Sequence, residues 1–301
     1  MRYLPGCLSL ITLLTACSSE PSDPASDDSP TYGAVLVLAD QDLRTVIEGQ
    51  HKMFEATYTD AKLEVRYLPE RELAQAMLND SVRAVFGYFR PGGEQEAYFK
   101  KRNLTPHVEA VATDGIALIV SKNSGMDSLS LEQVRALLTS TDSSASKRSA
   151  LFDSRSGGVV RSLVDSLFGG DVARLKNAVA VENPQALVER IASDSTAIGF
   201  LSFARISDLD NPAHKALRER VKLLRINAAP GTPALLPTQG SLADGHYPLR
   251  RSVYMLVTEG KSGLGTGFAS FVAGHKGQRI ILKQGIAPAH VPAREVMIVT
   301  E

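Results

Sequence analysis

The chain has 301 residues, and 44% of them are hydrophobic, which is enough to bury a large core and to form two lobes. Lysine plus arginine and aspartate plus glutamate both number 33, so the formal net charge is zero. This balance indicates neither a basic surface for nucleic acid nor a long acidic tail. The six histidines form no close pair, so no metal site is predicted.

The N-terminus has the features of a secretory signal peptide. A positive start at Arg2 is followed by an apolar run over residues 8–14, and the sequence LTAC then ends at Cys17. LTAC resembles the lipobox of bacterial lipoproteins, in which the peptide is cut before the cysteine and the cysteine carries lipid. The resemblance implies a lipoprotein signal peptide over 1–16 and lipidation of Cys17. The alternative is an ordinary cleaved signal peptide with an incidental cysteine.

Residues 17–32 are predicted to form a disordered tether. They include the stretch SSEPSDPASDDSPT, which has three prolines, four acidic residues and no large apolar residue, so it has nothing to bury. As a flexible coil, such a stretch reaches roughly 20 Å. No later stretch reaches the ~20 apolar residues of a membrane span, so lipid on Cys17 is the only membrane contact predicted.

After residue 32, apolar runs typical of strands alternate with segments of helical period. The predicted strands cover residues 33–39, 62–68, 82–89, 114–121, 197–203, 221–226 and 252–258. The predicted helices lie near 46–54, over 70–80, over 130–138 with an N-cap at Ser130, after residue 156, and over 267–285, where one or two are expected. Strands that alternate with helices indicate an α/β fold with mainly parallel sheets.

Sheets of this kind bind ligands beyond the carboxyl ends of their strands, where loops lead into helices. Three loops meet this condition, namely Asp40 to Asp42, Gly87 to Pro91, and Asp153 to Gly158. The third loop is the most distinctive, because the sequence SRSGG stands directly before an apolar stripe of helical spacing.

The start of this helix predicts an anion site. Ser156 is the expected N-cap, with Gly157 and Gly158 at the first helical positions. The first N–H groups of a helix have no partner within it, the helix dipole adds positive charge there, and glycines let an oxyanion approach the backbone. An ordinary capped helix after a turn explains the same residues and stays open as the alternative.

Neighbouring side chains add further donors to this helix start. The hydroxyls of Ser154 and Ser156 can donate hydrogen bonds, and Arg155 lies between them. Arg161 lies one turn into the helix, and helical side chains lean back toward the N-terminus, so its guanidinium can reach the same anion. No carboxylate lies within this turn, so the donor set is typical of a cradle for phosphate or sulfate.

Five stretches in chain order resemble the phosphate-binding protein of bacterial ABC phosphate importers, in its lipoprotein branch. They are VATDGIALIVSKNSGMDSLSLEQVRALLT (111–139), SRSGGVVRSLVDSL (154–167), AIGFLSF (197–203), ADGHYPLRRSVYMLV (243–257) and GLGTGFASFVAGHKGQRIILKQGIAP (263–288). SRSGG stands at the place of the family's Ser-Gly-Thr phosphate loop. The resemblance covers most of residues 33–300.

The resemblance implies a type II periplasmic-binding-protein fold, in which two lobes are joined by a two-stranded hinge and a ligand binds between them. Lobe one is expected to comprise residues 33–120 plus 248–301, and lobe two residues 121–247. Closure of such a hinge buries the ligand and signals the loaded state to a partner. Arg250 and Arg251 alternate in direction on a strand, so one of them is expected to form an ion pair between the lobes.

The family's phosphate loop carries over only in part. Ser156 and Gly157 match its Ser-Gly, whereas Gly158 stands where threonine is usual, so one hydroxyl donor is lost. The family's arginine four residues before the serine is replaced by a phenylalanine, and Arg155 or Arg161 is expected to substitute for it.

Two other loops are expected to contribute to the site. Arg90 in GYFRP matches the arginine of the family's SRP loop. Asp40, Gln41 and Asp42 stand where the family's first-strand loop supplies backbone N–H groups and hydroxyls. Hydrogen phosphate can donate its proton to a carboxylate in the cleft and sulfate cannot, so an ionised Asp40, Asp42 or Asp153 would favour phosphate.

The resemblance implies a binding protein that is not an enzyme, has no catalytic residues and uses no cofactor. It is expected to capture inorganic phosphate in the periplasm or at the cell surface and to deliver it to an ABC permease of the inner membrane. The alternative is a sensor or surface lipoprotein of the same fold that binds another oxyanion or an organic phosphate.

Overall fold

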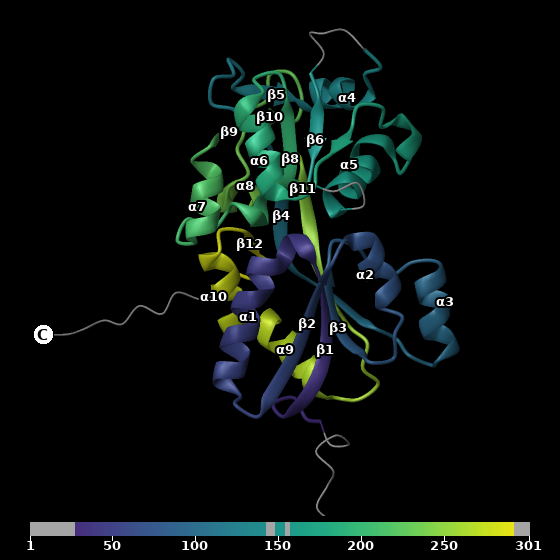
Figure 1. Cartoon of the computed structure of the whole chain (residues 1–301). Coiled ribbons are helices and arrows are strands. Elements are labelled where there is room, and N and C mark those ends of the chain that lie inside the picture. The colour runs from purple at the N-terminus through teal and green to yellow at the C-terminus, as the bar shows by residue number, and fades with distance from the viewer. Residues whose placement is uncertain (1–27, 143–147, 154–156, 292–301) are drawn as a thin grey trace, which may run out of the picture.

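The computed structural model describes residues 28–142, 148–153 and 157–291. The predicted signal peptide and Cys17 lie outside these ranges, and so do Ser154, Arg155 and Ser156. Figure 1 shows two halves, one above the other, which are joined by long strands.

The lower half in Figure 1 is built on three parallel strands, in the order β2 (Ala61–Leu68), β1 (Gly33–Asp40) and β3 (Val82–Gly87). Its other elements are the 3-10 turn η1 (Gln41–Leu43) and the helices α1 (Arg44–Thr57), α2 (Glu70–Ala76), α3 (Glu94–Lys101), α9 (Leu264–Ala273) and α10 (His275–Lys283). Residues 37–40 are all buried, as expected of a central strand that is covered on both faces.

The upper half has a second parallel set, in which β6 (Ala150–Phe152) lies between β7 (Val179–Ala180) and β8 (Ile198–Ser202). A small separate sheet pairs β5 (Ser128–Ser130) with β10 (Arg225–Asn227). The remaining elements are α4 (Leu131–Thr139), α5 (Gly158–Phe168), η2 (Val172–Arg174), α6 (Pro184–Ser193), η3 (Phe203–Arg205), α7 (Pro212–Arg218) and α8 (Gln239–Ala243).

Two long strands connect the halves, β4 (His107–Ser121) and β11 (Arg250–Val257). The first part of β4 pairs antiparallel with β11 as far as Gly115, and from Ile116 onwards it pairs antiparallel with β8. The short strands β9 (Val221–Leu223) and β12 (Ala287–Pro288) also pair with β4, and β11 pairs with β3. One hydrogen-bonded path of strands therefore runs through both halves.

Several predicted elements have different bounds in the structure. The strand predicted over 114–121 is the second part of β4, which begins at His107 because its first residues pair with β11. The strand predicted over 221–226 is two strands, β9 and β10, which pair with different partners. The N-cap at Ser130 is confirmed, since its Oγ accepts a hydrogen bond of 3.1 Å from the Gln133 backbone.

The packed part of the chain begins before residue 33, within the predicted tether. Asp28 forms an ion pair of 3.0 Å with Lys261 and accepts a hydrogen bond from the backbone N–H of Leu264, the first residue of α9. A Cβ on Gly267 would lie 1.8 Å from the carbonyl oxygen of Pro30, so only glycine allows this approach. Across the residues that the structure describes, no helix is long and apolar enough to cross a membrane.

Candidate functional site

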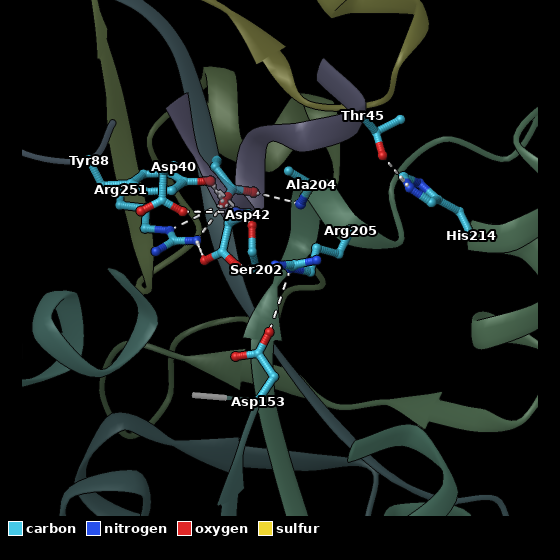
Figure 2. A network of polar contacts seen from close by, with 11 residues as sticks. Asp40, Asp42, Thr45, Tyr88, Asp153, Ser202, Ala204, Arg205, His214 and Arg251 are labelled. Atoms are coloured by element: carbon cyan, nitrogen blue, oxygen red, sulfur yellow. Dashed lines mark hydrogen bonds and ion pairs between the residues drawn. The ribbon is translucent and has the colours of Figure 1, made fainter. Parts of the chain in front are cut away.

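Buried charged side chains gather where the two halves meet, at the ends of strands from both (Figure 2). The three loops predicted from the sequence each contribute, through Asp40 and Asp42 at the end of β1, Tyr88 after β3 and Asp153 after β6. Further members come from the end of β8, from η3 and from the two connecting strands, and they are Ser202, Arg205, Asp114 and Arg251. We call these residues, together with Glu70 at the start of α2, whose charge interacts with Arg251 and Asp42, the junction network.

Arg251 and Asp114 form the centre of the junction network. Nε and Nη2 of Arg251 donate to Oδ2 of Asp114 at 3.2 and 3.0 Å, and Nη2 also donates to Asp42 at 3.1 Å. The Arg251 guanidinium lies over the ring of Tyr88, 3.4 Å from its centroid, where the negative ring face attracts it. Arg251 does form ion pairs, but Asp42 and Asp114 both belong to the expected lobe one, so these pairs do not join the two lobes as predicted, and Arg250 is exposed.

Asp114 connects the two halves through its other hydrogen bonds. It accepts from the Tyr88 hydroxyl at 3.0 Å, from Ser202 Oγ at 2.7 Å and from the Ala204 backbone at 2.9 Å. The side chain is fully buried, so these donors replace the water that the carboxylate has lost. Beside the network, Thr45 of α1 and His214 of α7 add a side-chain contact of 3.0 Å between the halves.

Two carboxylates in one turn have opposite pKa shifts. Burial opposes the ionisation of Asp42, but Arg205 and Arg251 outweigh it and hold the pKa of Asp42 below its usual range. Burial and the charge of Asp42 raise the pKa of Asp40 well above its usual range. Oδ1 of Asp40 accepts the backbone N–H of Asp42 at 2.8 Å, so Asp40 caps η1.

Asp153 lies at the upper edge of the junction network. Its Oδ2 is 3.5 Å from Nε of Arg205, which also pairs with Asp42 at 2.9 Å. Burial, together with the charge of Asp42, raises the pKa of Asp153 to about 7. Oδ2 of Asp153 is buried and accepts no hydrogen bond from the described part of the chain.

The anion site predicted at the start of α5 faces a carboxylate of the protein itself. Gly157 is the N-cap and Gly158 the first helical residue, so the predicted cap at Ser156 is wrong by one position. A Cβ on Gly158 would lie 2.7 Å from Oε2 of Glu70 and 3.0 Å from Nη1 of Arg251. Oε1 of Glu70 accepts a hydrogen bond of 2.9 Å from Arg161.

The other predicted site residues have different positions. Gln41 is half-buried at the start of η1. Arg90 is exposed, and its guanidinium lies over the ring of Tyr254, 4.7 Å from the centroid. Arg90 is therefore not part of the junction network, because the loop after β3 turns Tyr88 toward the network instead. Ser154, Arg155 and Ser156 lie outside the described residues.

Sequence reasoning missed several network residues, because their partners are distant in the chain. Asp114 lies inside a strand prediction, and its nearest partner in sequence, Tyr88, is 26 residues away. Glu70 reads as an ordinary acidic residue in the first turn of a helix. Arg205 follows a strand without any motif. The adjacent residues Arg250 and Arg251, which point to opposite sides of a strand, were the one sequence feature that indicated a buried ion pair.

Most acidic side chains of the junction network have an arginine as their partner. Among the described residues, no group of three His, Cys, Asp or Glu side chains is placed to hold a metal ion. Asp42, Asp114 and Asp153 pair with the guanidinium groups of Arg205 and Arg251, at the distances given above. Such paired charges can exchange partners when a charged ligand enters.

A family model and several solved structures match this chain. A family model described as the PBP superfamily domain matches residues 24–276. A substrate-binding protein of Clostridium perfringens, assigned to a phosphate ABC transporter and holding bound phosphate, is 16% identical over 86% of this chain and 100% of its own, with a TM-score of 0.70.

Two further solved structures have the same fold. An ABC-type phosphate transport receptor of Vibrio cholerae is 17% identical over 84% of this chain and 99% of its own, with a TM-score of 0.64. The substrate-binding domain assigned to a molybdenum ABC transporter of Clostridium difficile is 14% identical over 85% and 99%, with a TM-score of 0.50. No curated protein matches the sequence. Since the family model covers most of the chain, this protein belongs to the PBP superfamily and has a type II periplasmic-binding-protein fold.

Proposed function

We propose that the chain is a solute-binding protein for inorganic phosphate, held at the membrane by lipid on Cys17. It works in the periplasm or at the cell surface and delivers phosphate to an ABC permease of the inner membrane. The phosphate-binding and phosphate-transport proteins that share its fold support this assignment. The lobes are residues 33–120 plus 248–301 and residues 121–247, and they close on the ligand about the two connecting strands.

The observation that carries the proposal is the position of Arg251 beside the start of α5. Nη1 of Arg251 is buried without a hydrogen-bond partner in the described ranges, and it lies 3.0 Å from the Cβ position of Gly158. The first backbone N–H groups of α5 and this guanidinium N–H are donors that suit a tetrahedral oxyanion. Arg161 adds a second guanidinium, and Ser154, Arg155 and Ser156 are the further predicted donors.

A carboxylate beside these donors favours phosphate over sulfate. Oδ2 of Asp153 is buried and accepts no hydrogen bond from the described residues, so in its ionised form it is available to accept the proton of hydrogen phosphate. Sulfate has no such proton and would face a buried lone pair, which costs several kcal/mol. Asp42 is less suited to this role because both of its oxygens already accept hydrogen bonds from arginines.

Calorimetry with phosphate, sulfate and molybdate tests this proposal. We expect phosphate to bind and sulfate to bind far more weakly. Arg161→Gln should weaken phosphate binding about 10- to 100-fold, because a hydrogen bond to a charged group contributes about 1.5–3 kcal/mol. Arg90→Gln is the matched control and should leave the affinity unchanged, because Arg90 packs on Tyr254 away from the junction network.

Two results would contradict this assignment. Loss of binding in Arg90→Gln with full binding in Arg161→Gln would place the ligand at the loop after β3. Tight molybdate binding with no phosphate binding would support the alternative, a protein of this fold that recognises another oxyanion.

A further inference from the structure

Glu70 occupies the place where the proposed ligand would bind. It is the first residue of α2, in the lower half, and only 2% of it is exposed. Its Oε1 reaches Arg161 of α5, in the upper half, at 2.9 Å. Its Oε2 lies 2.7 Å from the Cβ position of Gly158, at the start of the same helix. The carboxylate thus pairs with Arg161 and lies beside the start of α5, both of which are proposed to hold phosphate.

One oxygen of the Glu70 carboxylate lacks the hydrogen bond that is expected in a permanent structural ion pair. Oε2 is buried and has no hydrogen-bond partner within the described ranges. A buried carboxylate oxygen without a partner is costly, so a position of this kind needs an explanation. Around Glu70, Arg161 of α5 and Arg251 of β11 are attractive, whereas Asp42 of η1 is repulsive.

We infer that Glu70 is an internal substitute for the anionic ligand. In the ligand-free protein its carboxylate takes the place of the anion at the start of α5, neutralises Arg161 and holds the two halves together. An oxyanion binds at this position only when the Glu70 side chain withdraws, because two anions cannot share one set of donors. Glu70 therefore sets the affinity for the ligand. The identification of that ligand as phosphate rests on the function proposed above.

Neutralising Glu70 is expected to strengthen ligand binding. Glu70→Gln keeps the size of the side chain and removes the competing charge, so phosphate should bind about tenfold more tightly, by ~1.4 kcal/mol. Glu70→Asp keeps the charge but withdraws it by one methylene, so its affinity should lie between those of the wild type and Glu70→Gln. Glu72→Gln is the matched control, because Glu72 lies on the same helix and is exposed.

The test combines calorimetry with small-angle X-ray scattering on the wild type and these three variants at pH 7. In phosphate-free buffer, Glu70→Gln should have a larger radius of gyration than the wild type, because a contact between the halves is weakened. Added phosphate should return it to the wild-type value. Urea unfolding of each variant checks that the variant is folded. If Glu70→Gln is not folded, Glu70→Asp is used for the comparison with the wild type.

The outcomes separate this inference from the proposed function. If the wild type binds phosphate and Glu70→Gln binds it equally or more weakly, Glu70 is no competitor and the inference fails alone. If no variant binds phosphate, the proposed function fails, and scattering decides the role of Glu70. An unchanged radius of gyration in Glu70→Gln would then overturn the inference, and a larger one would support the link between the halves.

Discussion

At the scale of single residues, environment rather than residue type decides which carboxylates carry charge. Asp40 and Asp42 are two positions apart and equally buried, yet only Asp42 contacts guanidinium groups. The pKa of Asp42 is therefore lowered, while burial and the charge of Asp42 raise the pKa of Asp40. The local sequence does not distinguish these two aspartates, because Arg205 and Arg251, the partners of Asp42, come from distant elements.

Asp153 gives a pH-dependent stability that can be measured. Its pKa is about 7 in the folded protein and ~3.9 in an unfolded chain, so the folded state holds the proton more tightly. As the pH rises from 4 to 7, the unfolded state loses this proton first, and Asp153 then lowers the stability of the fold. Asp153→Asn removes the effect and should raise the free energy of unfolding at pH 8 by on the order of 2 kcal/mol.

Urea titrations at pH 4 and pH 8 check this prediction. The wild type and Asp153→Asn should differ little at pH 4 and most at pH 8. Asp210→Asn, at an exposed position in the same half, should match the wild type at both values. A loss of stability in Asp153→Asn at pH 8 would instead mean that the ionised carboxylate stabilises the fold through Arg205.

At the scale of elements, a helix cap can be predicted from local sequence when its partner lies within the same segment. Ser130 and Gln133 form a reciprocal capping box, which a short window of sequence contains in full. The start of α5 differs, because the carboxylate next to it comes from Glu70 on another helix. The start of α9 is likewise satisfied by Asp28 and Glu259, from outside the helix.

The close contact between α9 and the residues before β1 predicts a strong effect of Gly267→Ala. The added methyl would overlap the backbone oxygen of Pro30, and overpacking of this kind costs about 1–3 kcal/mol. Gly240→Ala in α8 is the control, since open space surrounds that position, and it should be neutral or slightly stabilising. Urea unfolding followed by circular dichroism measures both. Equal stability of Gly267→Ala and the wild type would mean that residues 28–32 do not pack on α9.

At the scale of the whole molecule, one hydrogen-bonded path of strands runs through both halves, and the buried carboxylate of Asp114 forms hydrogen bonds to both. Asp114 lies on β4, at the point where its pairing passes from β11 to β8. It joins Arg251 of one connecting strand to Ser202 and Ala204 of the upper half. The two halves are therefore expected to unfold together, in one transition.

Asp114→Asn tests this coupling. The substitution leaves Arg251 with one fewer charged partner in a buried position, and loss of one member of a buried pair costs about 3–5 kcal/mol. Asp127→Asn is the control, because its pair with Lys222 is exposed and such pairs contribute about 0–1 kcal/mol. Unfolding monitored by fluorescence and circular dichroism should show a single transition in each variant. Two separate transitions, or a loss below 1 kcal/mol, would contradict the coupling.

The sequence by itself determined the class of fold, because strand and helix periods are local properties of the chain. It also placed three loops at the carboxyl ends of strands, and each of these loops contributes to the junction network. In the loop after β3, the sequence predicted Arg90 as the site residue, whereas the structure turns Tyr88 toward the junction network. The sequence of a loop does not show which of its side chains points inward. Only the tertiary structure decided that Glu70, Asp114 and Arg205 join the network, because charges distant in the chain become neighbours when the two halves pack together.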